Sequence, residues 1–434
     1  MSTLPTSALV KEFTARKIQA AIDTARMIGT QNHPFAESKK ALEQVEVQLN
    51  NLLQRLNRPN TSDTILRSYC KVALNELTEI IPLIGFIERS TEVTGPVEFF
   101  GPFSRITKCL VDEGVKLILS STWQFNPHTI IYPDQVAGVA NCVFVGFPVS
   151  ESDNALLTPL AAHEVGHNVW QKRGFENHLK NKISETVANI LKTDFKDRFA
   201  SNSLATPTVS RDLFGDDSWY TAYSWASKQL EKCFCDFLGG YLFGPAYLYA
   251  FAHYSCPGIE SGDPKYPPTI DRHTYLLAAA DNMKWDLNPS MRVGLFDSFS
   301  RSADVDASQL ATIFLEVADR TRECMVEEVR ALALQVATDA GLLYSQDEIE
   351  RVRGVFEKGL PAVGVLTVAA ICNAGWNFFI KKTLSDAEKS VPYLQSQESS
   401  KLINELMLKS FEIFEIETVL KEPSQCLTQM PLTN

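Results

Sequence analysis

The sequence predicts a mainly helical α+β fold with one small sheet. Over most of the chain, apolar residues recur every three to four positions, which is the spacing of an amphipathic helix. Only after Gly95 do short runs of β-branched and aromatic residues replace that spacing, each bounded by Pro, Asn, Asp or Gly. We therefore expect three regions: a helical one over 1–95, a mixed one over 96–285 and a helical one over 286–434.

Each region has its expected elements. In the first region, helices are expected over 9–27, 37–56 and 64–88, separated by the breaks at 32–34 and 59–63. In the second, strands are expected over 116–119, 129–132 and 142–147, a loop over 201–215, and helices over 176–194, 220–237 and 246–254. In the third, helices are expected over 304–341, 346–358, 360–380 and 399–418, followed by a tail over 422–434.

Composition excludes some classes of protein. With 45% hydrophobic and 21% charged residues the chain is ordinary for a soluble globular protein. The 41 basic and 52 acidic residues give a net charge of -11, which argues against a nucleic-acid partner. The nine cysteines are odd in number and scattered, and the first residues lack the apolar run of a signal peptide. We therefore expect a cytoplasmic protein with reduced thiols.

Two uncharged runs, 237–258 and 359–380, are long enough to cross a bilayer. The first contains six glycines or prolines, and the second contains Pro361, Asn373 and Asn377. Buried helices explain both runs better than membrane spans do, so we expect no membrane segment.

The most informative segment is the run of uncharged and apolar residues around His163, Glu164 and His167. Two residues four apart on a helix are separated by roughly 400° of rotation, so both imidazoles lie on one face and can reach one ion. Glu164 then lies beside the metal, where it can take a proton from a bound water molecule. The pattern predicts a zinc site with Glu164 as the catalytic base.

With this motif and a later helix that carries Glu231 and Asp236, the chain resembles the gluzincin metallopeptidases, over about residues 143–248. The resemblance implies a zincin-like catalytic core within 96–285, and a zinc ion whose third ligand is a glutamate on the later helix. These families commonly show Glu-x-x-x-Asp, in which the aspartate binds a ligand histidine. Here Lys232 stands four residues before Asp236, and Glu231 stands five before.

Glu231 is our expected third ligand, with Asp236 and Glu185 as alternatives, because zinc accepts any carboxylate there. On a regular helix Glu231 and Asp236 diverge by about 140°, so both face one ion only if the helix is distorted. Cys233 and Cys235 are interpreted as buried small residues, although thiolate ligation would suit a closed structural site.

Amide hydrolysis also needs a group that stabilises the oxyanion beside the metal. The candidates for this role, or for supporting the ligands, are Asp236, His253, Tyr254, Tyr266, Arg272 and His273. For all of these except Asp236, a structural hydrogen bond or an aromatic core role is the simpler interpretation.

The function expected from the motif and the resemblance is that of a zinc metalloendopeptidase that acts on protein or peptide substrates. One alternative is a zincin-derived protein-binding or sensor module without peptidase activity, and a second is a zinc hydrolase of non-peptide amides. The C-terminal helices are candidates for binding a regulatory protein partner.

Overall fold

The computed structural model describes residues 6–33, 35–58, 62–90, 97–122, 128–129, 141–148, 154–195, 213–255, 263–289, 309–388 and 393–421. The chain divides into two compact units, Met1–Asp153 and Asn154–Asn434. This division is coarser than the three regions expected from the sequence, whose limits at 95 and 285 stay a prediction. The protein is mainly helical with a small sheet, as expected.

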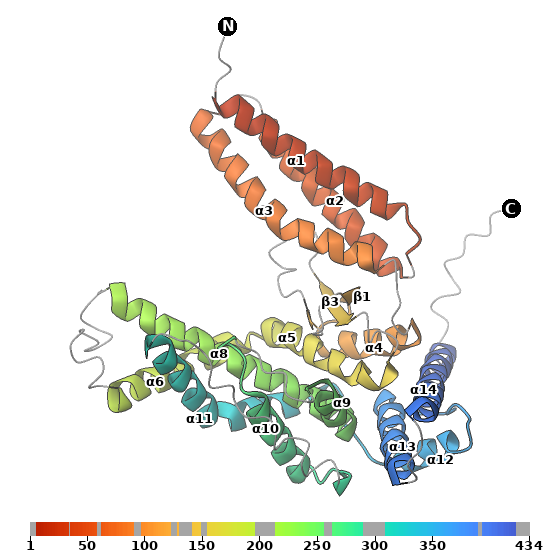
Figure 1. Cartoon of the computed structure of the whole chain (residues 1–434). Helices are drawn as coiled ribbons and strands as arrows, with labels where there is room; N and C mark the ends of the chain where they lie inside the picture. Colours follow the sequence, from red (N-terminus) through yellow and green to blue (C-terminus); the bar gives the residue numbers. More distant parts are fainter. Residues whose placement is uncertain are drawn as a thin grey trace, which may run out of the picture. The chain divides into compact units, whose positions relative to one another are not determined.

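The first unit begins with three long helices that pack on one another (Figure 1). They are α1 (Thr6–Gly29), α2 (Ala36–Leu56) and α3 (Asp63–Arg89), close to the ranges expected from the sequence. Their apolar positions form one core, which includes Ile22, Leu49 and Ile80. The helical spacing of the apolar residues therefore predicted this part of the fold correctly.

The sheet of the first unit has the order β1-β3-β2. Its strands are β1 (Lys116–Thr122), β2 (His128–Thr129) and β3 (Cys142–Pro148). β1 pairs with β3 in parallel, and β2 pairs with β3 antiparallel. The strands expected over 116–119 and 142–147 are confirmed, while residues 130–132 of the third expected strand lie outside the described part.

One helix of the first unit was not expected from the sequence. α4 (Val97–Leu110) lies where we expected only strands and turns, and Gly101-Pro102 within it is a pair typical of a turn. The helix buries Phe99, Phe103 and Leu110, and Pro102 is buried with them. Tertiary burial here outweighs the local preference of glycine and proline.

The second unit is built around α8 (Leu213–Phe243), against which α5, α6, α10 and α11 pack (Figure 1). Its elements in chain order are η2 (Ala155–Leu160), α5 (Ala161–Arg173), α6 (Phe175–Asp194), α8, α9 (Pro245–Ser255), α10 (Thr269–Asn282), α11 (Gln309–Asp339), α12 (Ile349–Phe356), α13 (Val368–Glu388) and α14 (Tyr393–Lys421). The expected helices over 176–194 and 246–254 are confirmed within a few residues.

α5 carries the His163 motif and is buried continuously from Ala161 to Trp170. It approaches α8 closely at Gly166, where an added Cβ would lie 3.0 Å from the Cα of Cys235. Its start is anchored through η2, whose Leu156 carbonyl accepts a hydrogen bond from Trp376 Nε1 on α13 at 2.9 Å. These contacts explain why α5 has no exposed face between Ala161 and Trp170.

α8 is longer than the expected helix over 220–237. It starts within the expected loop over 201–215 and continues through Gly239 and Gly240 to Phe243. The glycines do not end the helix because both allow close packing: an added Cβ on Gly239 would lie 2.3 Å from the Tyr247 ring, and one on Gly240 3.1 Å from Trp285. The helix stops before Gly244, whose φ is 58°.

The expected helix over 360–380 is wrong in its first turns, because α13 starts only at Val368. Gly359 and Gly364 have φ values of 70° and 61°, and Pro361 lies between them, so this stretch is not helical and the helix begins later. Among the helices of the described residues, none has the length and the apolar character needed to cross a membrane.

The contact between Gly239 and Tyr247 gives a test of this packing. Gly239→Ala should lower the free energy of unfolding by about 2 kcal/mol, because the new methyl group must displace a buried aromatic ring. Gly354→Ala in α12 is the matched control: nothing lies within 4 Å of its Cβ position, so alanine should stabilise the helix by about 0.5–1 kcal/mol. Urea unfolding measures both, and equal effects of the two substitutions would contradict the packing described.

Candidate metal centre

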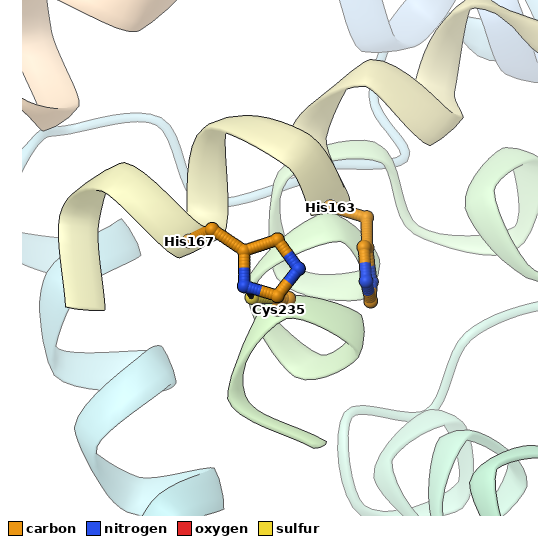
Figure 2. A group of neighbouring side chains, drawn as sticks. All are labelled: His163, His167 and Cys235. Carbon is orange, nitrogen blue, oxygen red and sulfur yellow. Dashed lines mark hydrogen bonds between the residues drawn. The ribbon is translucent and has the colours of Figure 1, made fainter. Parts of the chain in front are cut away.

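His163 and His167 lie one turn apart on α5 and both project toward α8 (Figure 2). Their ring centroids are 5.0 Å apart and the ring planes cross at 84°. Both are buried, with 7% and 1% of their surface exposed. The expectation that the two imidazoles share one face of a buried helix is confirmed.

Each imidazole is held at Nδ1 by a buried carboxylate of α8. His163 Nδ1 lies 2.8 Å from Asp236 Oδ1, and His167 Nδ1 lies 2.8 Å from Glu231 Oε1. Because an ionised carboxylate only accepts hydrogen bonds, Nδ1 of each ring is the donor. A carboxylate on one ring nitrogen is the usual partner of a metal-binding histidine, and it leaves Nε2 for the ion.

Asp236 is the best-connected of these carboxylates. Besides His163, it accepts a hydrogen bond from the Tyr247 hydroxyl at 2.8 Å and two from Arg272, from Nε at 2.7 Å and Nη2 at 2.8 Å. Burial alone would raise the pKa of Asp236, but the charge of Arg272 and the contacts with His163 hold that pKa well below its usual range. Asp236 is therefore ionised and joins α8 to α5, α9 and α10.

Glu231 is bound on both oxygens. Its Oε1 accepts from His167, and its Oε2 accepts from Lys228 Nζ at 2.7 Å. Burial opposes ionisation, yet the hydrogen bond with His167 and the charge of Lys228 lower the pKa of Glu231 to about 2. In this arrangement Glu231 supports His167, and its role as a direct metal ligand stays a prediction.

The other ring nitrogen of His167 faces a lysine. Lys232 Nζ lies 2.9 Å from His167 Nε2, and the same ammonium lies 4.4 Å from the centre of the Tyr266 ring. Burial and the charge of Lys232 lower the pKa of His167 to about 4, despite the opposing contact with Glu231. His167 is therefore neutral at pH 7, with its proton on Nδ1 and its lone pair on Nε2 toward Lys232.

Cys235 is nearer to the histidines than the sequence suggested. Its Sγ lies 3.4 Å from His167 Nδ1, and His163, His167 and Cys235 form a buried group whose ligand atoms lie within 4.8 Å of one another (Figure 2). Burial raises the pKa of the Cys235 thiol well above its ordinary value. Such a group could hold a metal ion, and the thiol would then release its proton to solvent and bind as the thiolate.

The donor atoms fit a zinc ion in part. Two imidazoles with carboxylates on Nδ1 are a common half of a catalytic zinc site, which needs a third protein ligand and an open position. In this arrangement Glu231 and Asp236 bind Nδ1 atoms and cationic side chains, so either residue as the third ligand stays a prediction. The side chain on the Nε2 face of His167 is Lys232.

Glu164, the predicted base, is buried, with 6% of its surface exposed. It lies near Tyr254, since its charge, after burial, is one of the factors that raise the pKa of Tyr254 to about 12. Arg272 is likewise near Tyr254, so the structure brings the predicted Tyr254 and Arg272 together with the motif. Tyr266 joins them through Lys232.

Three further predicted candidates lie differently. His253 is exposed and contacts Trp376 edge to face, and Glu185 is exposed on α6. His273 is buried, stacks on Phe251 and has its pKa lowered to about 3 by burial, which is the behaviour of a neutral core histidine. The simpler structural interpretation suits both histidines, and Glu185 as an alternative third ligand stays a prediction.

Three residues of the cluster were missing from the predicted site: Lys228, Lys232 and Tyr247. Lys228 and Lys232 lie three and four positions from carboxylates that the sequence did single out, so helical periodicity on α8 could have found them. Tyr247 comes from the next helix and contacts Asp236 only through tertiary packing, for which the sequence carries no local signal.

The buried Asp236 cluster gives the second prediction. Asp236→Asn should lower the free energy of unfolding by about 3–5 kcal/mol, because it leaves the charge of Arg272 buried without its partner. Glu412→Gln, in an exposed pair with Lys409, should cost at most about 1 kcal/mol. Urea unfolding followed by tryptophan fluorescence measures both, since five of the six tryptophans belong to the second unit. A loss of under 1 kcal/mol for Asp236→Asn would show that the cluster is not a stabilising contact.

Comparison with known proteins gives no match among protein-family models, curated proteins or solved structures.

Proposed function

We propose that this chain is a zinc-dependent peptidase of the zincin type, and that its centre is formed by α5 and α8. The observation that carries the proposal is the pair of buried carboxylates, Asp236 and Glu231, on the Nδ1 atoms of His163 and His167. A histidine pair of this kind is expensive to build for stability alone, because four titratable groups are withdrawn from water. The carboxylates orient the two imidazoles so that both Nε2 atoms can bind one ion, and this function accounts for the unfavourable burial.

His163 and His167 would hold the metal through Nε2. A zinc ion bound there would polarise the carbonyl of the substrate and make a water molecule more acidic. Glu164, one residue after His163 and buried beside it, accepts a proton on its carboxylate and delivers it to the departing amine nitrogen. Tyr254 is near both Glu164 and Arg272, and its hydroxyl or the Arg272 guanidinium would bind the oxyanion of the substrate.

A second function is favoured by one specific contact. The ammonium of Lys232 on His167 Nε2 suits a zincin-derived module that binds a partner protein and has no peptidase activity. The C-terminal helices would supply its surface: Leu366, just before α13, and Leu420, at the end of α14, are 74% and 78% exposed. We propose a cytoplasmic location for either function, from the scattered cysteines alone.

Metal analysis and a peptidase assay test the proposed function together. Purified wild-type protein at equilibrium with micromolar zinc should hold about one ion per chain, and His167→Ala should lose that ion. Glu164→Gln should keep the metal of the wild type and lose at least about a hundredfold in turnover of an unfolded protein substrate, because the proton acceptor is removed.

Two results would count against the proposal. Full activity of Glu164→Gln would remove the assigned base. Metal bound by the wild type without any hydrolysis of protein or peptide substrates would favour the partner-binding module instead.

A further inference from the structure

We infer that Lys232 is an internal competitor for the metal: its ammonium occupies the Nε2 face of His167, so that the centre holds zinc weakly and exchanges it readily. The inference rests on the proposed zinc centre and concerns how firmly that centre holds its ion.

His167 has a single ring lone pair, and Lys232 already occupies it. A neutral imidazole carries one proton and one lone pair. The proton of His167 is on Nδ1, where the Glu231 carboxylate accepts it at 2.8 Å, and the lone pair is on Nε2, where Lys232 donates at 2.9 Å. A metal ion on Nε2 needs the same lone pair. Lys232 must therefore leave His167 before an ion can bind there.

The position of Lys232 on α8 places its ammonium where a third metal ligand would be expected. Lys232 and Asp236 are four residues apart and share one face of the helix. Asp236 contacts His163 at Nδ1, while Lys232 contacts His167 at Nε2. The α8 residue that lies on the metal side of His167 is thus a cation. A carboxylate at this position would complete a centre with two histidines and one acidic ligand.

The charged side chains around the two histidines also disfavour a bound cation. The cluster contains three acidic side chains, Glu164, Glu231 and Asp236. It also contains three basic ones: Lys228 contacts Glu231, Arg272 contacts Asp236 and Lys232 contacts His167. These charges balance without an ion. A divalent cation added to this buried group brings two uncompensated positive charges close to Lys232, which lowers its affinity.

Lys232 is also held in place by its surroundings. Its ammonium lies 4.4 Å from the centre of the Tyr266 ring, a cation–π contact whose typical worth is about 0.5–2 kcal/mol. Displacing the lysine breaks this contact as well as the one with His167. Its side chain is half-buried, so it can move aside toward solvent when an ion arrives.

The test is the zinc dissociation constant, measured on the full chain by competition with a chromophoric chelator. Lys232→Glu replaces the competitor by a ligand. Changing a residue that contacts a ligand histidine alters metal affinity by about 10–100-fold, and the new carboxylate adds a metal ligand as well. This variant should therefore bind zinc at least about a hundredfold more tightly than the wild type. Lys232→Met removes the competitor without adding a ligand and should lie between them. Lys192→Glu, an exposed lysine of α6, introduces the same charge change away from the centre and should match the wild type.

The outcomes separate the inference from the proposed function. A wild-type affinity within about threefold of that of Lys232→Glu overturns the inference and leaves the zinc centre standing. Absence of zinc binding in every variant, Lys232→Glu included, overturns both, because a carboxylate at 232 then fails to complete the centre. If Lys232→Glu does not fold, as judged by circular dichroism, Lys232→Met decides: equal affinity to the wild type overturns the inference.

Discussion

The second unit depends on the ionised, buried carboxylate of Asp236. It accepts hydrogen bonds from His163 on α5, Tyr247 on α9 and Arg272 on α10, so one side chain of α8 fixes the positions of three other helices. A carboxylate with 2% of its surface exposed is costly to ionise, and these donors together offset the cost. The orientation of His163 follows from this arrangement, and so does the geometry of any ion that His163 binds.

A second buried ion cluster connects to the first through α10. Arg322 of α11, 1% exposed at its side chain, binds Asp319, Asp271 and the side-chain oxygen of Gln229. Asp271 and Arg272 are adjacent on α10. Asp271 binds Arg322 of α11, and Arg272 binds Asp236 of α8. Buried pairs contribute little to net stability compared with apolar packing, but they specify register, because a shifted helix would leave a charge unpaired. We interpret the two clusters as the reason why α5, α8 and α10 keep one register around the histidines.

The part of the centre that the sequence predicts is the part set by a single helix. His163, Glu164 and His167 are related by the α-helical repeat, so their spacing alone places them. The roles of Glu231 and Lys232 were harder to assign, because adjacent residues on α8 point about 100° apart and either one can meet α5. Tertiary packing decides which side of α8 meets α5. It is set by the close approach of Gly166 to Cys235, 69 residues away in the chain, and by the contact of the Tyr247 ring with Gly239. The same limit explains the two errors at helix ends: Gly239 and Gly240 are packing sites within α8, whereas Gly359 and Gly364 have positive φ and delay α13.

Buried carboxylates fix both imidazoles with Nδ1 protonated and Nε2 left for the metal ion. The most direct measurement is two-bond ¹H–¹⁵N correlation of histidine-labelled, metal-free protein at pH 7, with His163→Gln and His167→Gln used for assignment. We expect an Nδ1–H signal for both residues, and we expect Nε2 of His167 to carry no proton. An Nε2–H tautomer at either histidine would contradict it, because the carboxylates of Asp236 and Glu231 would then face nitrogens without protons.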